Sequence, residues 1–228
     1  MELLRSVSID GSDYKVLISD DAGALKKAGN KGISTIAVDP KGSLDVSLAE
    51  YAVESLELID DEFLKKVVCR KYNMPLTILK TKRLSLRELT CDDYTKLESS
   101  QALLECERYF ENEETFFNYI SINYRFFDYG IWALEDRYTG DFIGMAGLYL
   151  KNDSGRYFLS YFINPAYRNK GYAYEASKAI IKMTYKEVKP AIEIKKGNIA
   201  SIKLAEKLSK YSKDMLKYSI DIFYLDML

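Results

Sequence analysis

The chain has 228 residues, of which 47% are hydrophobic and 29% charged, a balance that is typical of a folded globular protein and excludes wholesale disorder. The 33 basic and 34 acidic residues nearly cancel, which argues against a nucleic-acid-binding protein. The absence of histidine excludes Ser-His-Asp triads, Cys-His dyads and histidine-ligated metals, so that acid–base chemistry depends on carboxylates, tyrosine, lysine, cysteine or water.

Residues 1–77 are predicted to form a small, Rossmann-like α/β domain. The predicted elements are, in chain order, a strand at 14–18, a helix after it, a strand at 33–38, weakly helical residues 44–50, a strand at 52–56 and a helix over about 60–72. Asp20 or Asp21 would cap the first helix at its amino terminus, and Gly32 would end it. Strands that alternate with helices predict parallel pairing and a layered unit.

Residues 78–228 show a different pattern and are predicted to form a second domain. The predicted elements are a strand at 83–89, helices near 91–99 and 112–126, strands at 130–136, 141–150 and 156–163, a helix over about 171–186, a strand at 191–195, a helix over 199–210 and a closing strand within 220–228. The turn sequence YTGD at 138–141 predicts that the second and third strands form a hairpin.

The connection between the strand at 156–163 and the next helix is typical of an anion-binding turn. A helix amino terminus leaves backbone N–H groups without partners and carries a partial positive charge. Gly171 permits a positive φ angle and a close approach to the backbone, while the small Ala173 leaves the helix start open. Arg168 and Lys170 add positive charge. The alternative is an ordinary strand–turn–helix connection with solvated basic residues.

Two motifs, IxPxYRxKGYAxEA at 163–176 and GNIASIKLAEKL at 197–208, resemble the GNAT superfamily of acyl-CoA-dependent N-acetyltransferases, in particular the branch that acetylates the amino termini of ribosomal proteins. The resemblance covers about residues 81–228. It implies an α/β fold with a mixed, mostly antiparallel sheet, flanking helices and a splayed strand that binds CoA. It also implies that the chain, as a monomer or a homodimer, moves an acetyl group from acetyl-CoA to a primary amine, either a protein amino terminus or a small amine, by direct transfer in a ternary complex.

The resemblance also implies roles for individual residues. The backbone amides that would wrap the CoA pyrophosphate belong to Arg168, Asn169, Lys170, Gly171, Tyr172 and Ala173. The strand residues whose backbone would pair with the pantetheine arm are Tyr161, Phe162 and Ile163. An N–H group of Phe162 or Ile163 would stabilise the oxyanion. Asn198 would approach the pantetheine arm with Ser201 one turn further on, although both residue types are also simply favoured at helix starts.

Two positions depart from the family pattern. Phe158 stands where many members carry a glutamate that could deprotonate the amine through water. Ala205 stands where many carry a general-acid tyrosine, although alanine is common in the amino-terminal-acetylating branch. The catalytic residues are therefore unassigned, and the carboxylates that could act as a base are Glu135, Glu175 and Glu193. Each also has a structural interpretation, and positioning alone could suffice because a free α-amine has a pKa of about 8.

The cysteines and an aromatic stretch are weaker candidates for a role in catalysis or acceptor binding. Nothing in the sequence lowers the pKa of Cys91 or Cys106, which disfavours a thiol nucleophile. The aromatic residues between 109 and 129 fall where the family binds its acceptor, and most are expected in the core, with Glu111, Glu113 and Glu114 near a cleft for a cationic amine.

The first domain has no comparable motif. Residues 16–38 faintly resemble the last part of a HAD-type phosphatase core, in which Asp20 and Asp21 would match an acidic loop near magnesium. The DxD nucleophile of that family has no counterpart, so that an accessory domain is expected rather than a phosphatase.

Neither a membrane nor a metal is expected as a partner. No window approaches the roughly 18 apolar residues that span a bilayer, and the amino terminus lacks the apolar core of a signal peptide. Three cysteines without zinc or CxxC spacing suit a reducing, cytoplasmic compartment. The sequence therefore predicts an acetyl-CoA-dependent N-acetyltransferase, with a non-catalytic acyl-CoA-binding sensor or interaction module as the alternative.

Overall fold

A computed structural model describes residues 1–99, 110, 112–151, 154–216 and 220–225. The chain folds as two compact units, Met1–Leu76 and Thr77–Leu228.

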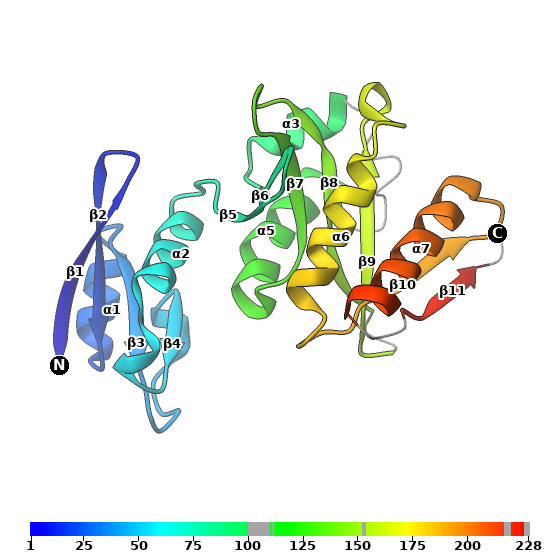
Figure 1. The fold of residues 1–228 in the computed structure, drawn as a ribbon. Helices are drawn as coiled ribbons and strands as arrows, with labels where there is room; N and C mark the ends of the chain where they lie inside the picture. Colours follow the sequence, from blue (N-terminus) through cyan, green and yellow to red (C-terminus); the bar gives the residue numbers. More distant parts are fainter. Residues whose placement is uncertain (100–109, 111, 152–153, 217–219, 226–228) are drawn as a thin grey trace. The chain divides into compact units, whose positions relative to one another are not determined.

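The first unit has a four-stranded sheet in the order β1-β2-β3-β4 (Figure 1). Its elements are β1 (Glu2–Ile9), β2 (Ser12–Ser19), α1 (Ala22–Gly29), β3 (Ser34–Val38), the 3₁₀ turn η1 (Val46–Leu48), β4 (Tyr51–Val53), the 3₁₀ turn η2 (Leu56–Leu58) and α2 (Asp61–Lys71). The parallel pairing predicted for this half holds for β2, β3 and β4. It does not hold for β1, which pairs antiparallel with β2.

The strand β1 was not predicted, because most of its side chains are exposed and its apolar signal is weak. A turn signal does exist: Asp10 and Gly11 have φ angles of 49° and 81°, as a two-residue type I′ hairpin turn requires. Asp21, not Asp20, caps α1 by accepting a hydrogen bond from the backbone N–H of Ala24 at 2.6 Å. The last residue of α1 is Gly29, and Gly32 terminates the helix as predicted: it has a φ angle of 75°, and the N–H groups of Gly32 and Ile33 donate to the carbonyl oxygens of Gly29 and Ala28.

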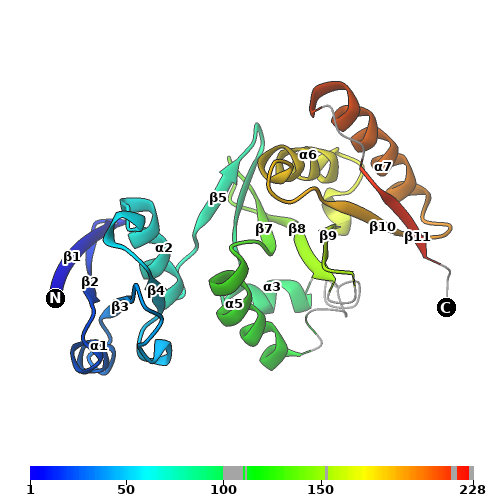
Figure 2. The same ribbon diagram turned by 90° about the horizontal axis from the view of Figure 1, so that it is seen from below.

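The second unit has a seven-stranded sheet in the order β11-β10-β9-β8-β7-β6-β5. Its elements are β5 (Thr77–Lys80), β6 (Leu84–Glu88), α3 (Asp93–Ser99), α5 (Glu113–Phe127), β7 (Ile131–Asp136), β8 (Phe142–Lys151), β9 (Arg156–Ile163), the 3₁₀ turn η3 (Pro165–Tyr167), α6 (Tyr172–Thr184), β10 (Ala191–Lys195), α7 (Ile199–Tyr211), the π-helical turn η4 (Ser212–Leu216) and β11 (Ile222–Leu225). Strands β5 to β9 pair antiparallel, and β10 pairs parallel with β9 and β11. Helices α3 and α5 lie on one face of this sheet and α6 on the other, beside α7 (Figure 2).

The strand β9 separates from β10 halfway along its length. It pairs with β8 from Arg156 to Ile163. With β10 it pairs only at Phe158 and Leu159. Beyond Leu159 the edge of β9 that faces β10 has no ladder, so that the backbone N–H groups of Tyr161 and Ile163, which point to that edge, are available to a ligand. This is the splayed strand expected from the sequence.

Two glycines let the backbone of β8 pack closely against its neighbours. A Cβ atom at Gly144 would lie 2.1 Å from the carbonyl oxygen of Phe162, and one at Gly147 would lie 1.9 Å from that of Gly130. A side chain is therefore excluded at both positions, and Gly144 lets β8 lie close to the end of β9 at Phe162 and Ile163.

The core of the second unit lies between the sheet and its helices, and Trp132, Phe116 and Tyr124 are among its largest fully buried side chains. Among the described residues, no helix combines the length and the apolar character that a membrane crossing would need.

Candidate functional site

A cavity of about 520 Å³ opens beside the free edge of β9. Ten of the eleven residues that the sequence predicted to bind the cofactor line it, namely Tyr161, Phe162, Ile163, Arg168, Asn169, Gly171, Tyr172, Ala173, Asn198 and Ser201. Lys170 is not part of the lining. Its amino group instead lies 5.1 Å from the centre of the Tyr167 ring.

The wall of the cavity before α6 is a turn of residues 168–173, named here the anion turn. Asn169 and Gly171 have φ angles of 62° and 81°, in the left-handed region. Gly171 is the N-cap of α6, and no side chain caps the helix. The first N–H groups of α6 are therefore available to an anion, and they carry the positive end of the helix dipole.

Two arginines hold the anion turn in place. Arg168 donates from Nε to the carbonyl oxygen of Ile163 at 2.9 Å, which ties the turn to the end of β9. Arg83, on the connection between β5 and β6, donates to the carbonyl oxygen of Lys170 at 2.9 Å, and its guanidinium lies 4.3 Å from the centre of the Tyr172 ring. No local pattern in the sequence points to Arg83, because more than half of the unit separates this residue from the turn.

Glu175, a candidate base, belongs to this support. Its carboxylate accepts hydrogen bonds from the Thr81 hydroxyl at 2.6 Å, from the Arg83 backbone N–H at 2.8 Å and from Arg83 Nε at 2.7 Å. Burial alone would raise the pKa of Glu175, but these hydrogen bonds outweigh it and lower the pKa. A carboxylate that is held ionised and fully engaged is a poor proton acceptor.

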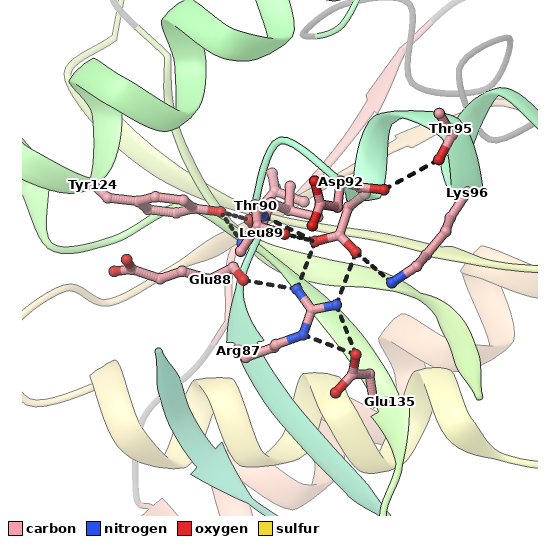
Figure 3. Close-up of polar contacts among 11 residues, drawn as sticks. Arg87, Glu88, Leu89, Thr90, Asp92, Thr95, Lys96, Tyr124 and Glu135 are labelled. Carbon is pink, nitrogen blue, oxygen red and sulfur yellow. Dashed lines mark hydrogen bonds and ion pairs between the residues drawn. The ribbon is translucent and has the colours of Figure 1, made fainter. Parts of the chain in front are cut away.

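Glu135, the second candidate base, belongs to a cluster of ionised side chains beside α3, named here the Arg87 cluster (Figure 3). Arg87 donates to Glu135 from Nε at 2.9 Å and from Nη2 at 2.7 Å. The same guanidinium binds the buried Asp93 at 2.6 and 2.8 Å, and Lys96 lies 3.1 Å from that carboxylate. Burial would raise the pKa of Asp93, but the hydrogen bonds from Arg87 and its charge lower it to about 2. Glu135 is therefore a structural ion-pair partner that does not line the cavity.

Glu193, the third candidate, lies on β10 beside Phe158. The amino group of Lys151 is 2.7 Å from its carboxylate, and the hydroxyl of Tyr149 donates to it at 3.1 Å. Tyr149 stacks on the Phe158 ring with 5.6 Å between ring centres, and the Lys151 amino group lies 5.7 Å from that ring centre. The carboxylate thus lies near the position where the family carries its glutamate, but it is ion-paired and does not line the cavity.

The pairing of β9 distinguishes the two predicted oxyanion donors. The backbone N–H of Asn164 donates to the carbonyl oxygen of Ile143 on β8 at 2.9 Å. Because N–H groups alternate between the two edges of an antiparallel strand, the N–H of Phe162 also points to β8. The N–H groups of Tyr161 and Ile163 point to the free edge. Ile163 is therefore the better donor, and Phe162 is not available for this role.

The start of α7 forms the opposite wall. Asn198 caps the helix by accepting a hydrogen bond from the backbone N–H of Ser201 at 3.0 Å, so that its helix-start role is present alongside its place in the lining. The hydroxyl of Tyr161 donates to Ser201 Oγ at 2.8 Å.

The sequence analysis missed six residues of the lining, which are Tyr167, Tyr174, Ala200, Lys203, Leu204 and Lys207. Four of them, namely Ala200, Lys203, Leu204 and Lys207, share a face of α7 at helical spacing, but only Leu204 would have been found by extending the Ser201 face. The exposed Lys203 and Lys207 add positive charge to this wall, which suits a phosphorylated ligand.

The weaker hypotheses gain no support. Burial raises the pKa of the Cys91 thiol, which makes it a poor nucleophile, while Cys106, Tyr109 and Glu111 lie outside the described residues. The hydroxyl of Tyr124 donates to the carbonyl oxygen of Ile131, as expected for an aromatic residue of the core. Across the part of the chain that the structure describes, no group of three or more cysteine and carboxylate side chains could hold a metal ion.

Comparisons with known proteins show the family of the chain. A family model described as "Acetyltransferase (GNAT) domain" matches residues 83–209. The uncharacterized protein YkkB of Bacillus subtilis (strain 168) is 31% identical over 108 residues, which are 45% of this chain and 63% of YkkB. The chain thus spans less than two thirds of the length of this curated relative.

Two similar solved structures are also acetyltransferases by title. The acetyltransferase from Agrobacterium tumefaciens str. C58 is 22% identical with a TM-score of 0.47, over 57% of this chain and 81% of that chain. The acetyltransferase (GNAT family) from Bacillus anthracis is 22% identical with a TM-score of 0.45, over 59% of this chain and 82% of that chain.

Proposed function

The chain belongs to the GNAT acetyltransferase family, and on that premise we propose that it transfers an acetyl group from acetyl-CoA to a primary amine, either a protein amino terminus or a small amine. The observation that carries this proposal is the cavity, whose walls combine the free edge of β9 with the uncapped start of α6. A site for an acyl-CoA needs both features, because the ligand has an amide-containing arm and a diphosphate.

The residues present suit acetyl-CoA. The cavity falls within the roughly 300–1,000 Å³ of typical ligand pockets. The amides of the anion turn would hold the pyrophosphate, and the N–H and C=O groups at the free edge of β9 would pair with the pantetheine arm. Lys203 and Lys207 would supply positive charge for the remaining phosphate. Arg168 would act mainly by holding the turn, because its Nε is bound to Ile163.

The proposed mechanism is direct transfer in a ternary complex. Acetyl-CoA supplies an activated thioester, and the neutral amine attacks its carbonyl carbon. The backbone N–H of Ile163 would stabilise the oxyanion, an effect of roughly 3 kcal/mol for one such donor. Alignment of the two substrates would contribute several further kcal/mol, on the order of 7–11 in favourable cases. No covalent enzyme intermediate is required.

Proton removal from the amine would depend on the acceptor itself. The three candidate carboxylates are each ion-paired, and none of them lines the cavity. We therefore expect kcat/KM to rise with pH through the pKa of the acceptor, and to shift by a comparable amount for an acceptor of different pKa. Two acceptors that differ by about one to two pKa units would test this. A common inflection that disappears in Glu135→Gln, Glu175→Gln or Glu193→Gln would instead identify an enzyme base.

A non-catalytic acyl-CoA sensor is the second candidate, and Phe158 and the paired carboxylates favour it. Calorimetry with CoA, combined with acetyl-CoA turnover against a panel of peptides and polyamines, separates the candidates. Turnover of one acceptor class would support the transferase and identify its substrate. Tight CoA binding without turnover of any acceptor would favour the sensor, and the absence of CoA binding would contradict both.

A further inference from the structure

The near balance of charge over the whole chain does not hold over its last two helices. Residues 178–213, which run from the middle of α6 to the turn after α7, contain ten lysines and only three acidic residues. A strong local excess of positive charge is the electrostatic feature that nucleic-acid-binding surfaces share. A whole-chain sum near zero therefore does not exclude a polyanion as a local partner.

Five of these lysines form a surface that is named here the basic helix face: Lys178 and Lys182 on α6, and Lys203, Lys207 and Lys210 on α7. We propose that the basic helix face binds single-stranded nucleic acid, with the lysines on the phosphates and tyrosine rings of the same helices against the bases. This inference goes beyond the proposed acetyl transfer and does not depend on it.

Helical spacing brings the lysines of this face together. Steps of four residues, and of three for the last lysine of α7, place each set on one side of its helix. The two helices lie side by side (Figure 2). The amino group of Lys178 lies 4.6 Å from the centre of the Tyr211 ring at the end of α7, so that the two sets border the same junction. Lys203 and Lys207 also line the cavity, so that the face begins where the CoA site ends.

The charges of the basic helix face are not compensated within the part of the chain that the structure describes. Elsewhere in the second unit, Arg83, Arg87 and Arg156 are each paired with a carboxylate. None of the five lysines has an ion-pair partner among the described residues, and all but the half-buried Lys178 are exposed. Like charges at this spacing destabilise a helix. A bound polyanion would supply the missing negative charge.

Aromatic side chains at the same junction favour nucleic acid over a lipid surface. Burial and the neighbouring phenols of Tyr174 and Tyr185 raise the pKa of Tyr211, so that three tyrosines gather where α6 meets α7. Single strands bind where cations follow the backbone and bases stack on aromatic rings. A lipid-binding helix needs a broad apolar side. Among the described residues of α6 and α7, the exposed large apolar side chains are only Met183 and Ile199.

The affinity of the full chain for a fluorescently labelled oligouridylate of about 20 nucleotides tests the proposal, measured by anisotropy at several salt concentrations. Each phosphate contact adds about −0.7 to the slope of log K against log salt, so that five lysines predict a slope of about −3.5. Combining Lys178→Gln, Lys182→Gln and Lys210→Gln should make the slope shallower by about 2 and lower the affinity at least about tenfold. These three residues do not line the cavity, so that CoA affinity should not change.

Matched controls separate the face from general charge and from general aromatic surface. Combining Lys26→Gln, Lys27→Gln and Lys41→Gln makes the same charge change at exposed positions of the first unit, and this variant should match the parent. Tyr211→Leu should weaken oligonucleotide binding by about tenfold and leave the binding of inorganic polyphosphate, which has no bases, unchanged. Tyr138→Leu, at an exposed position between β7 and β8, should have no effect on either ligand.

Equal oligonucleotide affinities of the two triple variants would overturn the proposal, as would a parent chain that does not bind the oligonucleotide. Binding to vesicles of phosphatidylserine and phosphatidylcholine without binding of the oligonucleotide would also overturn it and would identify an anionic membrane as the partner. Failure of the parent chain to bind CoA would contradict the proposed function and leave this inference intact.

Discussion

Two strand-to-helix connections in the second unit differ in how the polar groups at the start of the helix are satisfied. Between β6 and α3, the Arg87 cluster fills the start of the helix with charged side chains that are all paired within the protein. Between β9 and α6, the anion turn begins the helix at a glycine in the left-handed conformation, and no side chain caps it. Charges that are compensated internally stabilise the fold, whereas uncommitted N–H groups remain available to bind a ligand.

The same contrast explains why the carboxylates predicted as bases are poor candidates. Glu135 belongs to the Arg87 cluster, and Glu175 supports the anion turn from behind through Arg83. Both are engaged in holding the fold around the cavity. Among the described residues that line the cavity there is no carboxylate, and the polar side chains are hydroxyl groups, asparagine amides and cations.

Breaking the Arg87 cluster should have the largest effect on stability. Asp93→Asn removes the charge that faces a buried guanidinium, and the loss should be about 3 kcal/mol in the free energy of unfolding, measured by urea denaturation. Asp92→Asn changes an exposed carboxylate at the adjacent position and should be close to neutral. CoA affinity should persist in the folded Asp93→Asn protein, and its loss would mean that the two regions are coupled.

The cluster also predicts how stability changes with pH. The pKa of Asp93 in the folded chain, about 2, is below its ordinary value of 3.8. The stability that this group contributes is therefore fully present above pH 3.8 and is lost as the pH falls through 2. The parent should lose stability more steeply than Asp93→Asn in that window. Parallel acid-unfolding curves would contradict the assignment.

Closing the anion turn should have the largest effect on binding. Gly171→Val places a β-branched residue at a φ angle of 81°, which forces the turn to rearrange, and CoA affinity should fall by at least about 100-fold in calorimetry. Gly140→Val is the matched control, because it puts the same strain, at a φ angle of 77°, into the turn between β7 and β8. A Gly171→Val protein that binds CoA as tightly as the parent would show that the site is assigned wrongly.

Weakening the contact between Glu175 and Arg83, which supports the anion turn, should have a smaller effect on CoA affinity. Glu175→Gln keeps the size of the side chain but removes its charge-assisted bonds to Arg83, and CoA affinity should fall by about tenfold, or about 1.4 kcal/mol. Glu206→Gln makes the same charge change at an exposed position of α7 and should have no effect. Equal affinities in both variants would separate Glu175 from the binding function.

The smallest effect on stability is expected in the first unit, from loss of the N-cap of α1. Asp21→Ala removes the acceptor for the Ala24 N–H and should cost about 1 kcal/mol of stability, while Asp21→Asn should retain most of it. CoA affinity should not change in either variant. A change in affinity would show that α1 contributes to the site.

Several local features could be predicted because their signals are local. The bounds of β9 and β10 were predicted without error, and the hairpin of β7 and β8 followed from its turn sequence. The predicted helix at 44–50 was wrong in extent, since only a three-residue 3₁₀ turn forms there. The exposed strand β1 was missed because periodicity is weak where little is buried.

The sequence by itself indicated most of the elements and the positive-φ glycine before α6, because hydrophobic spacing, capping residues and a turn motif act over a few residues. The residues expected around the ligand followed instead from the resemblance of two motifs to a known family. Only the tertiary structure decided which charged side chains are already paired with one another within the protein. Arg83 and Glu175 are 92 residues apart, and Arg87 and Glu135 are 48 apart. The register of the sheet and the packing of α3 and α6 bring them together. Whether a carboxylate is free to react depends on such distant partners, and no local pattern records them.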